Sequence, residues 1–433
     1  LAIFFYFATE PCFCQLSFVR ESIMEILLMF FIVYPIAMSI FWIIGTLIYY
    51  VFIERKLKAK HINYQPKEGI SFIIACYNEA STIAETIKNL NDLSYPIKEI
   101  IAVNDGSSDH TKEELLRLKQ MYKIKFINLE ENRGKANALN VAAQYAQYPY
   151  LMCVDADTII DDDASYYMVE SLVDDPTIGA VTGNPRIRNK STLLGKIQTI
   201  EYASMIGSIK RAQTINGFVN TISGVFTLFN KKALEKNQYW DTDMITEDIA
   251  VSWKFHLSGY KIKYEPRALC WMLVPETFKG LWKQRVRWSQ GGHEVILRDF
   301  KNMFKVRNVS LWFLYIEQIL SVIWVYGIVV ILCYTLLRLN FLDYYFYNYQ
   351  LNIFLISAFL LTFINVIQFT ISLLIDSRYE RKNNLFLIFL SWYPTFYWLI
   401  NAIVVIAAFP KALKRKKGEF ATWTSPDRGN IKE

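Results

Sequence analysis

The sequence is poor in the side chains that build metal centres and nucleophilic triads. Its 433 residues include only four histidines, and their spacing indicates neither a metal pair nor a triad. Of the six cysteines only Cys12 and Cys14 lie close together, and no second pair completes a zinc site. We interpret them as reduced cysteines of a protein that faces the cytosol.

Charged residues are also few, at 20%, whereas hydrophobic residues reach 53% and aromatic residues 16%. The net charge of +7 is modest, and much of it lies beside apolar runs, at Arg55–Lys60 and Lys411–Lys417. That placement suits anionic lipid headgroups better than nucleic acid, so no nucleic-acid partner is expected. A mean hydropathy above zero in a chain of this length indicates a soluble domain joined to membrane spans.

Long apolar stretches flank the middle of the chain. Ile26–Ile53 carries no charge and is long enough to cross a bilayer about 30 Å thick, and the cations that follow it predict a cytoplasmic end. The later apolar stretches are 311–337, 351–375 and 385–409. The loop 376–384 and the tail after residue 410 are both cationic, which predicts that both are cytoplasmic. Segment 385–409 therefore either re-enters, bending near Pro394, or precedes a tail that breaks the charge rule.

Residues 70–275 alternate between apolar strands and helical stretches. The predicted strands are Ile70–Ala75, Glu99–Asn104, Lys125–Leu129, Tyr150–Val154 and Gly179–Thr182, and the predicted helices lie around 80–91, 111–121, 134–146 and 163–173. Such alternation predicts an α/β domain whose mostly parallel sheet is covered by helices on both faces. Ligands then gather at the carboxyl ends of the strands, where the polar clusters of this sequence fall.

Two polar clusters follow the first two predicted strands. In Ala75–Glu79 an aromatic ring and a carboxylate can stack on a nucleobase and accept from its N–H, although a plain strand-to-helix turn capped by Asn78 or Glu79 also fits. In Val103–Asp109 a carboxylate followed by glycine and serine makes a turn that a ribose or base can contact. The same residue types favour an ordinary surface turn.

Two carboxylate clusters come later in the chain. Asp155 and Asp157 directly follow an apolar strand, and such a pair can hold a divalent cation that neutralises a nucleotide diphosphate. Acidic residues are also common at strand ends that bind no metal. In Thr246-Glu247-Asp248 a carboxylate held in a pocket can take a proton from an attacking hydroxyl, while the same three residues fit a helix start.

The last cluster is Gln284-Arg285-Val286-Arg287-Trp288. On a helix, residues 284, 287 and 288 share one face, which presents an amide, a guanidinium and an indole together. Arginine can grip a diphosphate through paired N–H bonds, and an indole offers a flat surface for a sugar ring. The surrounding pattern Leu281–Phe304 is amphipathic, so this helix can also lie on a membrane surface.

In this order the clusters resemble the processive family 2 glycosyltransferases, which include the cellulose, chitin, hyaluronan and poly-N-acetylglucosamine synthases. The segments that narrow the resemblance to the poly-β-1,6-N-acetylglucosamine synthases of the staphylococcal, intercellular-adhesion type are Gly183–Asn189, Asn220–Phe226, Trp240–Asp248 and Gly291–Glu294. The resemblance covers residues 24–433. It implies a GT-A-type cytosolic domain that polymerises N-acetylglucosamine from UDP-GlcNAc and helps to export a biofilm exopolysaccharide. A hyaluronan, chitin or cellulose type of synthase is the alternative within the family.

The resemblance also implies a role for each motif residue. The residues expected to bind the nucleotide are Tyr77, Glu79, Asp105 and Lys135. Asp155 and Asp157 are expected to meet the diphosphate and a divalent cation, Mg²⁺ or Mn²⁺. The residues expected around the acceptor sugar and the leaving diphosphate are Ser223, Gly224, Glu247, Gln284, Arg287 and Trp288. Asp248 is expected to be the general base.

The same resemblance sets the expected domain order. It runs from a mistranslated or non-native leader (1–23) through a transmembrane helix (24–53), a cytosolic catalytic domain (54–280), amphipathic interface helices (281–310) and transmembrane segments (311–410) to a basic tail (411–433). The expected partners are the growing polysaccharide, membrane lipid and a small membrane accessory subunit. A transporter or receptor with a nucleotide-sensing domain is the rival of another class, and it would need neither a base nor a metal site.

Overall fold

The computed structural model of the chain describes residues 29–57, 65–338 and 344–422. Eight strands form one sheet in the order β3-β2-β1-β4-β7-β6-β8-β5. The strands are β1 Ile70–Cys76, β2 Lys98–Asp105, β3 Ile124–Leu129, β4 Tyr150–Val154, β5 Ile159–Ile160, β6 Ile178–Ile187, β7 Phe226–Asn230 and β8 Lys261–Met272. Strands β3, β2, β1 and β4 are parallel, whereas β7 is antiparallel to both of its neighbours. The predicted α/β class is confirmed, and the sheet is mixed beyond β4.

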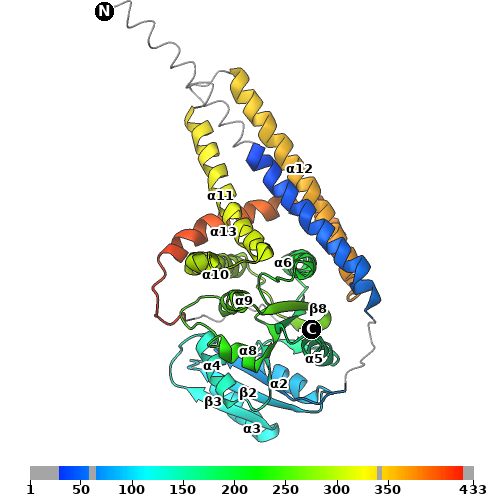
Figure 1. Cartoon of the computed structure of the whole chain (residues 1–433), viewed down its shortest axis with the longest axis vertical. Coiled ribbons are helices and arrows are strands. Elements are labelled where there is room, and N and C mark those ends of the chain that lie inside the picture. Colours follow the sequence, from blue (N-terminus) through cyan, green and yellow to red (C-terminus); the bar gives the residue numbers. More distant parts are fainter. Residues whose placement is uncertain (1–28, 58–64, 339–343, 423–433) are drawn as a thin grey trace, which may run out of the picture.

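Helices cover both faces of this sheet (Figure 1). One layer contains α2 Ile83–Asp92, α3 Thr111–Met121 and α5 Ala164–Val173, and the other contains α4 Lys135–Tyr145, α8 Lys231–Lys236 and α9 Glu247–Leu257. In β1, Phe72 and Ile74 pack into the first layer, while Ile73 and Ala75 pack into the second, because successive side chains of a strand alternate. A strand that is buried on both faces therefore has an unbroken apolar sequence.

A continuous helical segment between β6 and β7 joins the sheet to the membrane region. It consists of α6 Leu193–Tyr202, the π-helix η2 Ala203–Ser208 and α7 Ile209–Ile215. Thr192 caps its start, since Oγ1 accepts from the N–H of Gly195 at 3.1 Å. The π-helix packs against α12 (Tyr344–Asp376), where Nε2 of Gln368 donates to Oγ of Ser204 at 3.1 Å. The catalytic fold and the membrane helices thus share a packed boundary.

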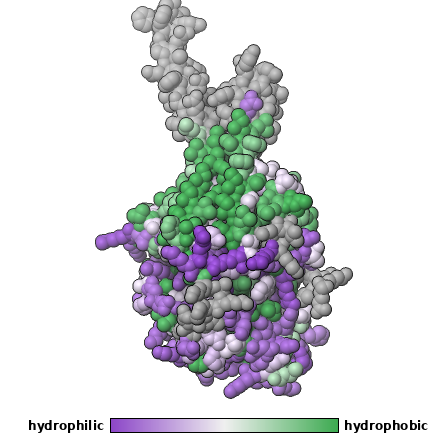
Figure 2. Space-filling view, turned by 90° about the vertical axis from the view of Figure 1, so that its right-hand side faces the viewer, coloured by the Kyte–Doolittle hydropathy of each residue, from purple (hydrophilic) through white to green (hydrophobic). Residues whose placement is uncertain are grey.

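Four helices among the described residues are long and apolar enough to cross a membrane: Met29–Lys56, Val309–Ile331 within α11 (Val309–Arg338), Leu355–Asp376 within α12, and α13 (Tyr393–Leu413). The first three rise away from the sheet, and Figure 2 shows a continuous hydrophobic surface in that region above a largely hydrophilic base. The predicted leader, residues 1–23, lies outside the described residues. Several membrane segments therefore flank the catalytic fold in the sequence, as predicted.

The fourth helix, α13, runs across the others (Figure 1). The short helix η3 (Arg381–Ser391) precedes α13 in the chain, and Arg378 comes just before η3. Arg378 donates to the backbone oxygen of Glu54 at 2.7 Å, beside the catalytic fold. After α13, Nε of Arg415 donates to the backbone oxygen of Asp243 at 3.0 Å. Both ends of the segment therefore return to the same side, and the re-entrant alternative agrees with both cationic flanks. The change of direction precedes α13, whose first turn contains Pro394.

Buried ion pairs fix the first membrane helix to the catalytic fold. The end of that helix forms the short η1 (Glu54–Lys56), and the buried carboxylate of Glu54 accepts from Nε and Nη2 of Arg211 at 2.5 and 2.9 Å. Nη1 of Arg211 also lies 2.9 Å from Asp376 at the end of α12, and Asp376 accepts from Arg186 at 2.7 Å. Removing one member would leave a buried charge without its counterion, which is strongly destabilising. The network holds α7 in a fixed position against the membrane helices.

Candidate active site

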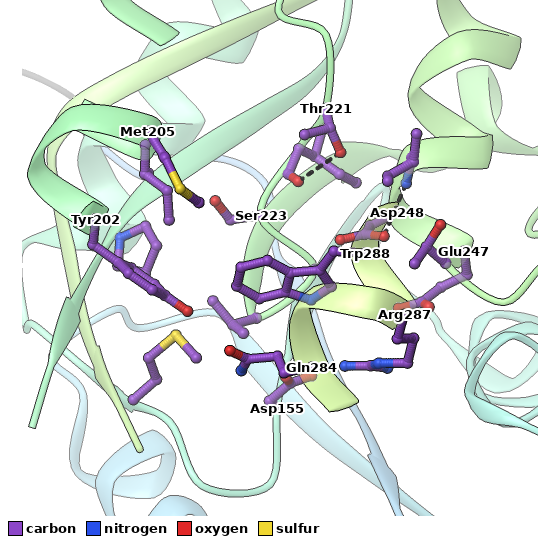
Figure 3. Close-up of a pocket in the computed structure, with 18 of the residues that line it drawn as sticks. Asp155, Tyr202, Met205, Thr221, Ser223, Glu247, Asp248, Gln284, Arg287 and Trp288 are labelled. Atoms are coloured by element: carbon purple, nitrogen blue, oxygen red, sulfur yellow. Dashed lines mark hydrogen bonds between the residues drawn. The ribbon is translucent and has the colours of Figure 1, made fainter. Parts of the chain in front are cut away.

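One cavity of about 240 Å³ opens at the carboxyl ends of the central strands, beneath the membrane helices. Ten of the residues singled out in the sequence line it: Lys135, Asp155, Asp157, Ser223, Gly224, Glu247, Asp248, Gln284, Arg287 and Trp288. Figure 3 shows the indole of Trp288 in the middle of the cavity, with Tyr202 on one side and Asp248 on the other. Motifs that are more than 100 residues apart in the sequence therefore meet in one place.

Asp155 and Asp157 enter this cavity from the loop that follows β4. The N–H of Asp155 donates to the backbone oxygen of Val225 at 3.2 Å, which ties this loop to the start of β7. Nζ of Lys135, at the start of α4, lies 2.6 Å from Oδ1 of Asp155 and 3.1 Å from Oε1 of Glu247. Burial opposes the charge of Lys135, but the two carboxylates outweigh it and raise the pKa of the ammonium above its ordinary value.

Glu247 and Asp248 form the first turn of α9. The side chain of Thr246, at the helix N-cap, makes no capping hydrogen bond, whereas Oδ1 of Asp248 accepts from the N–H of Ile249 at 2.9 Å. Burial, together with the charge of Glu247, raises the pKa of the Asp248 carboxyl to about 6, and Lys135 and Arg287 limit that rise. A carboxylate with this pKa is ionised near neutral pH and is still a useful proton acceptor.

Gly224 allows the Asp248 carboxylate to lie directly against the backbone of the 223–224 turn. A Cβ on Gly224 would lie 3.0 Å from Oδ2 and 3.2 Å from Cβ of Asp248. The preceding residue is fixed in place, because the N–H of Ser223 donates to Oγ1 of Thr182 at 2.8 Å and its backbone oxygen accepts from Thr227 at 2.8 Å. The turn therefore defines one wall of the cavity beside the carboxylate.

The wall nearest the membrane comes from α10 (Phe278–Met303). Its Gln284, Arg287 and Trp288 face the cavity, whereas Arg285 points away and pairs with the buried Glu201 of α6. The guanidinium of Arg285 lies 4.6 Å from the ring centroid of Trp288, which is a cation–π distance. The Arg285 guanidinium thus contacts one side of the indole, and the part of the indole that lines the cavity is available to a ligand.

The three remaining predicted residues lie at the ends of β1 and β2, outside the lining of the cavity. The carboxylate of Asp105 accepts from the backbone N–H groups of Arg133 and Gly134 at 3.1 and 2.9 Å, so it holds the loop before α4. Oε2 of Glu79 accepts from Oγ1 of Thr82 at 3.0 Å, and Tyr77 lies beside it in the chain, partly exposed. These contacts are compatible with a folding role as well as with nucleotide binding.

The chain after α13 returns over the same loop. Ala421 donates its N–H to the backbone oxygen of Thr242 at 2.8 Å, and the ring of Phe420 lies 5.6 Å from the Arg133 guanidinium. A Cβ on Gly134, whose φ is +92°, would come within 2.2 Å of the backbone oxygen of Ala421. Only glycine fits this conformation and this close approach.

Sequence reasoning missed the contribution of residues 202–210 to the cavity. Tyr202, Met205, Ile206 and Lys210 all line it, from the helical segment that contains the π-helix. The sequence held one signal, because Lys210 and Arg211 are consecutive cations in a stretch, 202–217, that has no other charged residue. Both residues are buried, whereas lysine and arginine are usually exposed to solvent.

Residues 71–237 match the family model for glycosyl transferase family 2. The chain is 62% identical over 409 residues to a poly-β-1,6-N-acetyl-D-glucosamine synthase of Staphylococcus epidermidis, an alignment that covers 93% of this chain and 98% of the relative. A synthase of the same name from Staphylococcus aureus strain COL is 61% identical over 404 residues, with the same coverage. Among solved structures, the mannosyltransferase PcManGT from Pyrobaculum calidifontis, in complex with GDP-Man and Mn²⁺, superposes with a TM-score of 0.60 at 20% identity. That superposition covers 89% of this chain and 100% of the other, and at this identity it shows a shared fold.

Proposed function

This chain belongs to the poly-β-1,6-N-acetyl-D-glucosamine synthases of glycosyl transferase family 2, and we propose how its residues carry out that synthesis. It is a membrane enzyme that polymerises N-acetylglucosamine from UDP-GlcNAc processively, with inversion at the anomeric carbon. The observation that carries the residue assignment is the single cavity that Asp155, Asp248 and Trp288 share. A base, a diphosphate site and a sugar platform within one cavity are the parts that glycosyl transfer requires.

The diphosphate and sugar of the donor occupy the cavity beside the loop after β4, and its uridine extends beyond the cavity to the ends of β1 and β2. Tyr77, Glu79 and Asp105 hold uridine, and Lys135 balances the negative charge of the nucleotide. The two carboxylates of Asp155 and Asp157 fit a divalent cation that is bound together with a diphosphate. Among the described residues no third acidic, histidine or cysteine side chain joins them, and Mg²⁺ commonly takes one or two carboxylates with the substrate phosphates. When bound, Mg²⁺ or Mn²⁺ supplies positive charge to the departing diphosphate.

Asp248 is the general base. Its carboxylate accepts the proton of the acceptor hydroxyl while that oxygen attacks the anomeric carbon, and the bond from that carbon to the UDP oxygen breaks. The guanidinium of Arg287 stabilises the charge that grows on UDP, because fixed donors in a water-poor site cost little reorganisation. A single displacement of an α-linked donor yields a β-linked product.

The acceptor end lies on Trp288, which stacks against a sugar ring, with Gln284 and the 223–224 turn at its edges. The indole remains in place as each sugar is added because Arg285 and Glu201 hold it from the far side. Helix α10 lines the cavity and packs against α11 and α13, so the growing chain leaves along the membrane helices. The catalytic domain lies in the cytoplasm, on the side of the cationic segments 376–384 and 411–417, in contact with anionic lipid, and a small membrane subunit assists the synthase.

Donor choice tests this function. Membranes that contain the chain are incubated with labelled UDP-GlcNAc or UDP-glucose, and both UDP release and incorporation into polymer are measured. Polymer should form from UDP-GlcNAc and not from UDP-glucose. Comparable incorporation from UDP-glucose would assign the chain to a cellulose type of synthase. Failure to release UDP during incubation with UDP-GlcNAc would favour a nucleotide-sensing membrane protein.

A further inference from the structure

Lys210 lies in the cavity, and neither the motifs nor the mechanism above uses it. It belongs to α7, the residue is 4% exposed, and it lines the cavity. Its Nζ donates to Oγ of Ser223 at 2.6 Å. A buried ammonium at a substrate cavity is costly to desolvate, so its presence calls for an explanation.

The other buried cations of the described chain all have a carboxylate partner. Arg186 and Arg211 pair with Asp376 at 2.7 and 2.9 Å, and Arg285 pairs with Glu201. Among these buried lysines and arginines of the described residues, Lys210 is the exception, because a hydroxyl oxygen is the atom that accepts from it. An ammonium has three N–H donors. The donors that Ser223 does not use are available to a ligand in the cavity.

The π-helix before Lys210 affects which face of the helical segment this residue occupies. Tyr202, Ile206 and Lys210 line the same cavity at successive intervals of four residues. In a regular α-helix of 3.6 residues per turn, residue 210 would be rotated by about 80° from residue 202. The wider turns of the π-helix Ala203–Ser208 lie between them and reduce that rotation, and such insertions often occur at functional sites.

Lys210 and Asp248 each contact one residue of the 223–224 turn. Lys210 contacts the side chain of Ser223, and the Asp248 carboxylate packs against the next residue, Gly224. A ligand oxygen above this turn would meet an ammonium donor and a carboxylate acceptor together. That arrangement suits a hydroxyl group, which accepts one hydrogen bond and donates another.

We propose that Lys210 is an acceptor-binding residue that donates a hydrogen bond to a hydroxyl oxygen of the terminal acceptor sugar and so orients that sugar toward Asp248. This inference rests on the proposed synthase function. In the transfer step the acceptor O–H bond breaks as the oxygen bonds to the anomeric carbon, the proton goes to Asp248, and the bonding pair of the broken C–O bond leaves with UDP. Lys210 keeps all of its protons and acts by position and charge.

The electrostatics around Lys210 agree with this role. The ionisable groups that face its ammonium are Asp248 on α9 and Cys270 on β8. Burial lowers the pKa of Lys210 to about 7, although both groups oppose that change. The ammonium is therefore present below pH 7 and is lost as the pH rises above it. A hydrogen bond from this ammonium gives the rate an alkaline limb near pH 7.

The test compares Lys210→Met with Lys254→Met in membranes or detergent, with polymer formation, UDP affinity and thermal unfolding measured for each. Lys254 is an ion-paired lysine of α9, 2.8 Å from Asp241 and outside the cavity, so it is a matched control. Lys210→Met should lower the polymerisation rate roughly 10- to 100-fold, as expected for a lost hydrogen bond from a charged group. It should leave UDP affinity unchanged, and its Tm should equal or exceed that of the wild type because an unpaired buried charge is removed. Lys254→Met should keep the wild-type rate and lower the Tm.

Lys210→Arg supplies the second readout. Arginine stays protonated across the whole pH range, so this variant should keep part of the rate and lose the alkaline limb near pH 7. A near-wild-type rate for Lys210→Met would overturn the inference. So would a Lys210→Met variant that loses both rate and Tm, together with a Lys210→Arg variant whose pH profile is unchanged. A wild-type chain that makes no polymer from UDP-GlcNAc would instead contradict the proposed function.

Discussion

Lys135 and Glu247 form an ion pair in the cavity, with Nζ 3.1 Å from Oε1. The same ammonium lies 2.6 Å from Asp155, so it joins the carboxylate assigned to the diphosphate and the first acidic residue of α9. Glu247 is therefore engaged by a cation, whereas its neighbour Asp248 packs against Gly224 and lines the cavity beside that glycine. The two adjacent carboxylates therefore have different surroundings, which agrees with the proposal that Asp248, and not Glu247, is the general base.

The first prediction follows from that difference. Asp248→Asn keeps the size of the side chain and removes its basicity, so the polymerisation rate should fall by about 10²–10⁴-fold. UDP affinity, measured by titration, should stay near the wild-type value because the nucleotide contacts are assigned to other residues. Glu247→Gln is the companion variant, and it should disturb UDP binding through Lys135. A near-wild-type rate in Asp248→Asn together with an inactive Glu247→Gln would assign the base to Glu247.

The rate should depend on pH through the same carboxyl. Asp248 acts as a base only when it is ionised, and its pKa is raised to about 6 by burial and by Glu247. The value of kcat/KM should therefore fall tenfold per pH unit well below this pH, which gives the rate an acid limb in addition to the alkaline limb expected from Lys210. Initial rates of UDP release between pH 4.5 and pH 7 check this prediction. An acid limb near pH 4, the ordinary range of an aspartate, would mean that the environment does not raise the pKa of the essential base.

A methyl group on Gly224 should damage catalysis more than folding. In Gly224→Ala the new Cβ would meet the Asp248 carboxylate at 3.0 Å and displace it, so the polymerisation rate should fall at least roughly tenfold. Gly292→Ala on α10 is the matched control, since a Cβ there meets no heavy atom within 4 Å. That variant should keep its rate and gain slightly in Tm, because alanine favours a helix. Equal rates for both variants would show that the contact with Gly224 does not position the base.

Trp288→Ala should change the length of the product. The variant loses the surface on which the acceptor ring stacks, while the assigned UDP contacts remain, so UDP affinity should stay the same and the polymer should be shorter. Product sizing by gel filtration measures this effect. Polymer of wild-type length at a reduced rate would indicate that Trp288 serves the chemical step and does not retain the chain.

The sequence predicts the central strands β1 and β4 closely because both are almost fully buried and therefore have largely apolar sequences. Tyr150–Val154 has the predicted bounds, and Ile70–Cys76 differs from its prediction by one residue. By contrast, the first half of β8 (Lys261–Met272) alternates charged with apolar residues and is followed by Pro266, so only its second half, Ala268–Met272, has an apolar run. Strand β7 pairs with β4 across more than 70 residues, a contact that local patterns do not encode.

The residues of the cavity likewise divide into those that the sequence predicts and those that it does not. Residues in compact polar motifs at strand ends, such as Asp155 and Asp157, can be singled out from the sequence because the parallel topology brings strand ends together. Lys210 stands in no such motif, and its inward direction depends on the π-helix that precedes it. Hydrogen-bond spacing of that kind has no dependable sequence signal, so the residue becomes visible only in the folded chain.

The linkage and anomeric configuration of the product test the central claim most directly. The purified chain, supplied with UDP-GlcNAc and a divalent cation, should release UDP and make a polymer whose NMR spectrum shows β-configured N-acetylglucosamine joined through O6. An α-linked product, a β-linkage through another oxygen, or transfer of a single sugar without chain growth would contradict the assignment of this chain as an inverting, processive poly-β-1,6-N-acetylglucosamine synthase.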